Sequence, residues 1–88
     1  MKSRFRSGFL RDIKKIRDKQ VLASVRAVIG SIDKAEKLVD IPNLRRLSGA
    51  KSLYRIRIGD YRIGLAVEDE TVEFVRCLHR RDIYGYFP

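Results

Sequence analysis

The first third of the chain carries apolar residues at the spacing of amphipathic helices. Residues Lys2–Arg6 fit a short strand, and Ser7 can cap the helix that follows it. Four apolar positions share one face of that helix: Phe9, Leu10, Ile13 and Ile16. A second run repeats the spacing over about three turns: Val21, Leu22, Val25, Val28, Ile29 and Ile32. The pattern predicts two helices that are joined near Asp18 and Lys19.

The pattern changes from helical to alternating after a loop. Residues Lys37–Ser52 contain Pro42, Asn43 and Gly49, which favour turns, so we expect a loop that crosses the domain. From Tyr54 to Ile58, apolar residues alternate with arginines. Such alternation is typical of a strand with one buried face.

Two tight turns are expected to connect this strand to two more. Gly59 and Asp60 form the first turn, after which the apolar positions alternate again: Tyr61, Ile63, Leu65 and Val67. Asp69 and Glu70 form the second turn. Beyond them, Thr71–Leu78 is rich in Val, Phe and Thr, which favours a third strand.

The composition is that of one small folded domain. Of the 88 residues, 44% are hydrophobic, so we expect a single domain over residues 1–88 and little disorder. Cys77 is the only cysteine, which excludes an internal disulfide and a metal site built from several thiolates. No segment approaches the roughly 20 apolar residues that span a bilayer. We therefore expect no membrane association and a reducing, cytoplasmic location.

The charge balance indicates a polyanionic partner. Twenty Lys and Arg side chains against eleven Asp and Glu give a formal net charge of +9. A field of this sign attracts polyanions. Nucleic acid, the ribosome, an acidic protein and an anionic membrane surface all stay open on charge alone, because net charge indicates a class of partner and not a reaction.

The alternating strands bring three arginines together. If the first turn has two residues, Arg57 lies directly opposite Arg62, and Arg55 lies two residues along the same face. One interpretation is a solvated outer face in which Glu68 or Glu73 pairs with these arginines. The other is a phosphate-binding surface, since guanidinium groups bind phosphate oxygens bidentately and stabilise the charge of a phosphorane-like transition state.

The same register can be extended into the third strand. A two-residue second turn places Cys77 opposite Arg62 and His79 on the arginine face. His79 is the only histidine, so this position makes it a candidate for proton transfer. The register points Arg76 toward the apolar face, which indicates either a bulge in the strand or an uncovered end of the sheet.

The last residues, LHRRDIYGYFP, combine basic and aromatic side chains. An exposed RNA base can stack on a ring while its phosphate contacts a guanidinium group. Alternatively, Tyr84, Tyr86 and Phe87 pack a C-terminal turn onto the sheet.

These segments together resemble the RelE toxin family, the ribosome-associated messenger-RNA endonucleases of bacterial and archaeal toxin–antitoxin modules. The resemblance covers almost the whole chain: two N-terminal helices, the segment LRRLSGAKSLYRIRIGDYRIGLAV and the closing HRRDIYGYF, with YRIRIGDYRI as its most specific part. It implies an α+β fold in which two N-terminal helices pack on one face of a small, mostly antiparallel β-sheet.

The resemblance also implies the site. Basic residues at Arg55 and Arg57, the arginine at Arg62, a late arginine and a C-terminal tyrosine would act in catalysis. Arg80 and Arg81 compete for the late arginine, and Tyr84 and Tyr86 compete for the tyrosine. Our candidate catalytic set is Arg55, Arg57, Arg62, His79, Arg81 and Tyr84, and our candidate RNA-binding set is Arg46, Lys51, Arg80 and Tyr86.

The expected reaction is attack of a ribose 2′-hydroxyl on the adjacent phosphorus, without a metal or another cofactor. The arginines would hold the phosphate, Tyr84 would act as the base, and His79 would protonate the leaving oxygen, or the reverse. The expected partners are messenger RNA in the ribosomal decoding site and a RelB-like antitoxin, with DNA contacted only through that antitoxin. The alternatives are a ParE-like inhibitor of DNA gyrase and a non-catalytic RNA- or ribosome-binding module.

Overall fold

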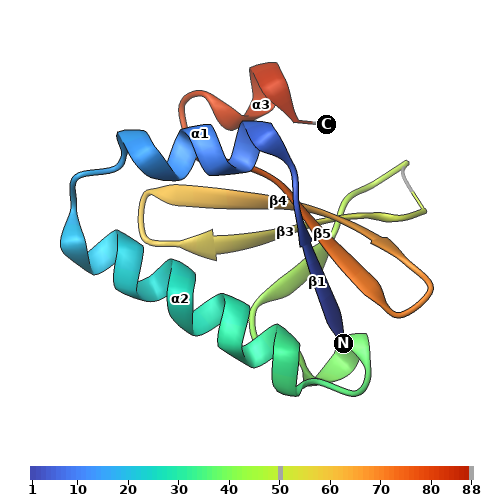
Figure 1. Ribbon diagram of the computed structural model, residues 1–88. Coiled ribbons are helices and arrows are strands. Elements are labelled where there is room, and N and C mark those ends of the chain that lie inside the picture. Colours follow the sequence, from blue (N-terminus) through green and yellow to red (C-terminus); the bar gives the residue numbers. More distant parts are fainter. Residues whose placement is uncertain (50, 88) are drawn as a thin grey trace.

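The computed structural model describes residues 1–49 and 51–87 (Figure 1). Residues 50 and 88, which the predicted loop and the predicted domain include, lie outside the described residues. In chain order, the elements of the described residues are β1 (Lys2–Phe5), α1 (Ser7–Lys15), α2 (Lys19–Lys34), the 3-10 turn η1 (Leu38–Asp40), β2 (Leu44–Arg46), β3 (Leu53–Ile58), β4 (Tyr61–Glu68), β5 (Thr71–His79) and α3 (Ile83–Tyr86).

The strands form a single sheet with two helices against one face. Within the described ranges, the five strands follow the order β1-β5-β4-β3-β2. β1 runs parallel to β5, whereas the other neighbouring strands are antiparallel. α1 and α2 follow β1 along the chain and cover the sheet (Figure 1). α3 is the last element of the chain and contacts β5. The predicted α+β fold is confirmed.

The boundary between the two long helices is set by a capping side chain. The Asp18 carboxylate accepts hydrogen bonds from the backbone N–H groups of Gln20, at 2.9 Å, and Val21, at 3.3 Å. This cap confirms the predicted junction near Asp18. The predicted cap of the first helix is wrong, because Ser7 is already helical and Arg6 occupies the N-cap position without a side-chain hydrogen bond.

The core lies between the helices and the sheet. Phe74 of β5 contacts Phe5 and Phe9, with ring centroids 5.0 and 5.1 Å away. In this core, the side chains that are almost fully buried come from α1, α2 and the three long strands and include Phe9, Ile32, Ile56, Ile63, Leu65, Val72 and Phe74. The apolar faces predicted from the two periodicities therefore meet in one core, except that Leu10 of the first helix is exposed.

The predicted loop contains a short strand that its sequence did not reveal. Asn43 adopts a φ of 62°, and the chain then enters β2, which pairs with β3 so that Arg45 lies opposite Arg55. Three residues are too few for an alternating pattern to be recognised. The described part of Lys37–Ser52 is thus partly ordered into η1 and β2.

The β3–β4 hairpin has the predicted register. Ile58 pairs with Tyr61, and Arg57 pairs with Arg62. Gly59 has a φ of 59°, which suits a glycine at the first central position of a two-residue hairpin turn. The prediction that Arg57 faces Arg62 is confirmed.

The β4–β5 pair departs from the predicted register because β5 contains a bulge. Leu65 pairs with Phe74, but the next pair is Gly64 with Arg76, so Val75 is an extra residue in β5. Of the two interpretations of Arg76, the bulge is confirmed.

The bulge moves two residues of β5 to the face opposite the predicted one. A shift of one residue exchanges the faces of every later side chain in the strand. Cys77 therefore pairs with buried Ile63, and His79 pairs with Tyr61, whereas Arg62 pairs with Leu78. The predicted positions of Cys77 opposite Arg62 and of His79 on the arginine face are both wrong.

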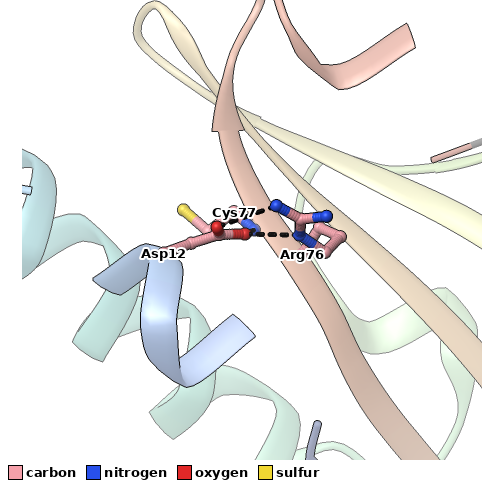
Figure 2. Close-up of polar contacts among 3 residues, drawn as sticks. All are labelled: Asp12, Arg76 and Cys77. Atoms are coloured by element: carbon pink, nitrogen blue, oxygen red, sulfur yellow. Dashed lines mark hydrogen bonds and ion pairs between the residues drawn. The ribbon is translucent and has the colours of Figure 1, made fainter. Parts of the chain in front are cut away.

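A buried carboxylate of α1 holds the bulge in place. Asp12 accepts hydrogen bonds from Arg76 Nε at 2.7 Å, from a terminal nitrogen of Arg76 at 3.0 Å and from the backbone N–H of Cys77 at 2.9 Å (Figure 2). The hydrogen bonds from Arg76 to Asp12 raise the pKa of the Arg76 guanidinium above its ordinary value. The irregular backbone of β5 is thus satisfied by a side chain from a distant helix.

Candidate functional site

A cleft of about 620 Å³ opens on the sheet face that points away from the core. Its walls come from the start of β2, from both strands of the β3–β4 hairpin and from α3. We call it the arginine cleft, and its lining residues are Asn43, Leu44, Arg45, Arg55, Arg57, Gly59, Arg62 and Tyr84.

Four of the described lining residues are arginines. Arg55, Arg57 and Arg62 were predicted from the alternation of the hairpin, and the cleft brings all three together. Arg45 was missed. It reaches the cleft because β2 pairs with β3 and sets Arg45 beside Arg55. The sequence shows two adjacent arginines, Arg45 and Arg46. Without the register of β2, the sequence does not indicate which of the two reaches the cleft.

The arginines of the cleft repel one another. Burial and the nearby guanidinium groups of Arg57 and Arg55 lower the pKa of Arg62 below its ordinary value. A terminal nitrogen of Arg62 donates hydrogen bonds to the backbone carbonyls of Gly59, at 2.8 Å, and Tyr61, at 2.9 Å, which hold the side chain in place. The cleft is thus an ordered cluster of positive charge.

Within the described residues, no acidic side chain forms an ion pair with Arg45, Arg55, Arg57 or Arg62. Glu73, one of the two expected partners, pairs instead with Arg6 of the β1–α1 connection at 2.9 Å. Among the described residues, the ion pairs that involve arginines join Arg6 to Glu73, Arg76 to Asp12 and Arg80 to Asp60. The interpretation of a solvated face with paired charges therefore lacks support, and the cleft is suited to an external anion.

Tyr84 is the tyrosine that reaches the arginine cleft. The guanidinium carbon of Arg55 lies 5.0 Å from the centroid of the Tyr84 ring, a cation–π contact. Tyr84 is 69% exposed, so its ring remains accessible from solvent. Tyr86 lies elsewhere, because its ring stacks against Arg76 with the guanidinium carbon 5.1 Å from the centroid.

His79 and Arg81 lie outside the cleft. The His79 ring makes an edge contact with Tyr61, at 5.6 Å between centroids, on the helix-covered face of the sheet. Its Nδ1 accepts a hydrogen bond from the backbone N–H of Arg81 at 3.2 Å. Arg81 and His79 both line a separate hollow beside Asp12 and Tyr86. The structure therefore does not bring these two predicted catalytic residues to the arginines.

Arg80 is the late arginine that acts on the cleft. Its charge contributes to the lowered pKa of Arg62. Its backbone N–H donates to the carbonyl of Asp60 at 2.7 Å, and its guanidinium lies 4.0 Å from the Asp60 carboxylate. These contacts fix the end of β5 beside the hairpin turn.

The two remaining predicted RNA contacts lie away from the cleft. Arg46 pairs with Tyr54, whose side chain packs against the core, so Arg46 belongs to the opposite face from Arg45. Lys51 is exposed in a bend and does not line the cleft.

Two further properties of the described residues bear on function. In residues 1–49 and 51–87, no three His, Cys, Asp or Glu side chains group closely enough to hold a metal ion. Across the same ranges, the helices are too short or too polar to span a bilayer.

Comparison with known proteins relates both the sequence and the fold to toxins. The family model for ParE toxins of type II toxin–antitoxin systems matches residues 4–84. Toxin RelE3 of Methanocaldococcus jannaschii is 35% identical over 89 residues, which cover all of both chains.

Solved structures give the same relationship. A crystal structure of a RelB–RelE antitoxin–toxin complex from Methanococcus jannaschii matches with a TM-score of 0.82 and 32% identity, covering 97% of this chain and 99% of that one. The toxin–antitoxin complex RelBE2 from Mycobacterium tuberculosis matches with a TM-score of 0.69 and 27% identity, covering 90% and 96%.

Proposed function

This chain belongs to the RelE/ParE superfamily of toxins of type II toxin–antitoxin systems, and we propose that it is an endoribonuclease that cleaves messenger RNA in the ribosomal decoding site. The observation that carries this proposal is the arginine cleft, where four guanidinium groups that form no ion pair within the described residues share one surface with the exposed Tyr84.

The cleft is proposed to bind the phosphate of the scissile bond. Arg57 and Arg62 face each other across the hairpin and can contact oxygens on two sides of one phosphorus. Arg45 and Arg55 extend the same surface toward the neighbouring phosphate. As the 2′-oxygen attacks, the phosphoryl oxygens gain negative charge, and guanidinium groups already in place stabilise it without reorganisation.

In the proposed cleavage step, each proton that moves has a donor and an acceptor. The 2′-oxygen bonds to the phosphorus as its proton passes to a base, the bond from phosphorus to the 5′-oxygen breaks, and the 5′-oxygen takes up a proton. The products are a 2′,3′-cyclic phosphate and a 5′-hydroxyl. No metal ion is needed for this balance.

Tyr84 is the proposed base. Of the described residues that line the cleft, it is the only ionisable one besides the arginines, which stay protonated and cannot accept a proton. His79 would have to act from the other face of the sheet, so we omit it and assign protonation of the 5′-oxygen to water. The proposed catalytic residues are therefore Arg45, Arg55, Arg57, Arg62 and Tyr84. Arg80 adds positive charge near Arg62 and fixes the end of β5.

An acidic antitoxin is the proposed regulator. The solved relatives include toxins in complex with RelB-type antitoxins. The net charge of +9 on this chain favours an acidic, partly disordered peptide that covers the arginine face or wraps the helices. Covering the cleft would neutralise its charge and exclude RNA.

The test is cleavage by an Arg62→Ala variant. With purified translating ribosomes, wild-type protein should produce new messenger ends inside the decoding site. Loss of one preorganised charge should lower the rate on the order of 10²–10³-fold. Arg46→Ala, which changes an arginine on the other face, should cleave as wild type does. Equal rates for wild type and Arg62→Ala, with RNA binding intact, would contradict the proposal.

One observation favours a second function, since the matching family model is that of ParE toxins. In that case the protein would inhibit DNA gyrase by binding it and would leave RNA intact. A supercoiling assay separates the two functions: inhibition of gyrase without messenger cleavage supports the ParE-like function.

A further inference from the structure

Gly64 lies in the row of the arginines but carries no side chain. It sits on β4 directly opposite Arg55 and two residues from Arg62, on the same face of the sheet. Its φ is not among the positive values, so the backbone itself would accept an alanine. The neighbouring side chains, and not the backbone conformation, therefore account for a glycine at this position.

Phe87 occupies the space that a side chain at residue 64 would fill. A Cβ atom built on Gly64 would lie 2.6 Å from Cγ and 2.7 and 2.8 Å from the two Cδ atoms of the Phe87 ring. These separations are far below van der Waals contact. Because Cγ is close to the Phe87 backbone, the clash cannot be relieved at the far end of a flexible side chain.

The contact between Gly64 and Phe87 fixes the short C-terminal helix. Phe87 is 4% exposed and Ile83 is fully buried, and the backbone N–H of Phe87 donates to the carbonyl of Ile83 at 2.8 Å. Tyr84 lies between these two buried residues and points its ring to Arg55. α3 is thus one turn held at both ends, and Tyr84 is one of its exposed residues.

A second contact supports the same arrangement. Tyr86 of α3 stacks on Arg76, and Arg76 is itself held by the buried carboxylate of Asp12 (Figure 2). Two arginine–tyrosine stacks therefore flank the contact between Gly64 and Phe87.

We propose that Gly64 and Phe87 are positioning residues that set Tyr84 over the arginine cleft. The inference rests on the proposed endoribonuclease function, in which Tyr84 takes the 2′-proton. Neither Gly64 nor Phe87 lines the cleft, so both act through the position of α3. A side chain at residue 64 would lift Phe87 from the sheet and carry Tyr84 away from Arg55.

The experiment compares Gly64→Ala with Gly85→Ala. Gly85 is an exposed residue of α3, and nothing lies within 4 Å of a Cβ atom added there. Both variants gain one methyl group, but only the first clashes with Phe87. In a single-turnover assay, Gly64→Ala should cleave on the order of 10–100-fold more slowly, since misplacement by about 1 Å has an effect of this size. Its affinity for a non-cleavable RNA should change less than threefold, and Gly85→Ala should match wild type.

A double variant shows whether Gly64 acts through Tyr84. In a Tyr84→Ala background, Gly64→Ala should cause no further loss of rate, because the residue that it positions is already absent. A full additional loss would overturn the proposal. If Gly64→Ala does not fold, Phe87→Ala replaces it, because removing the ring releases α3 without a clash.

A spectroscopic readout keeps the inference separate from the proposed function. Ring-current shifts of the Arg55 side-chain protons report the Tyr84 contact in wild type and in Gly85→Ala. Loss of these ring-current shifts in Gly64→Ala supports the positioning role, even if the wild-type protein cleaves no RNA. Absence of RNA cleavage by the wild-type protein would refute only the proposed endoribonuclease function. Unchanged shifts and an unchanged rate in Gly64→Ala would overturn the positioning role.

Discussion

Arg57 and Arg62 lie directly opposite each other across the β3–β4 hairpin, although each repels the other. Like charges on facing strand positions lower the stability of a sheet. Both arginines lie in one cleft with Arg45 and Arg55, which indicates a surface that is complementary to an anion although its charges lower the stability of the fold.

Removing one of these charges should therefore stabilise the free protein. We expect Arg57→Gln to raise the free energy of unfolding by roughly 0.5 kcal/mol at low salt, because one like-charge pair is lost. Urea denaturation measures the change, and about 1 M salt should abolish it by screening. Arg26→Gln, on the exposed side of α2, serves as the control. A loss of stability in Arg57→Gln at low salt would show that the cluster is not strained.

The adjacent arginines of β2 should differ in their effect on RNA binding. Each phosphate contact with a single strand contributes about −0.7 to the slope of log K against log salt concentration. Arg45→Gln should reduce the magnitude of that slope by about 0.7, since Arg45 lines the cleft. Arg46→Gln should leave it unchanged, because Arg46 is on the other face. Fluorescence anisotropy with a non-cleavable RNA gives both slopes, and equal slopes for the two variants would refute this assignment.

The two ion pairs of β5 should differ in their contribution to stability. Asp12 is 5% exposed and accepts three hydrogen bonds, so Asp12→Ala leaves Arg76 and the Cys77 N–H without a partner. We expect a loss of about 3 kcal/mol in the free energy of unfolding. Glu73→Gln breaks the pair with Arg6, which is 57% exposed, and should lower it by less than about 1 kcal/mol. Chemical denaturation of both variants tests the difference, and similar losses would contradict it.

Cys77 should make the folded state sensitive to alkaline pH. Burial raises the pKa of its thiol from an ordinary value of 9.0 to about 12. The unfolded chain therefore loses this proton first as the pH rises. The contribution to stability is complete below pH 9.0 and falls by up to about 1.4 kcal/mol per pH unit toward pH 12. The stability difference between wild type and Cys77→Ala should shrink over this range, and a constant difference would exclude the effect.

The sequence by itself determined the main elements and the hairpin of the cleft. Helical spacing and alternation depend on local geometry, and Gly59 allows a two-residue turn that sets the register of β3 and β4. Once that turn is known, Arg55, Arg57 and Arg62 must share one face. The predicted cluster of three arginines therefore needed no tertiary information.

Only the tertiary structure decided the rest of the cleft. The bulge at Val75 is stabilised by Asp12 from a distant helix, and it moved His79 to the other face. No local pattern encodes such a contact. Arg45 entered the cleft through the pairing of β2, and Tyr84 entered it through the docking of α3. Each of these choices depends on contacts between residues far apart in the chain, which periodicity does not record.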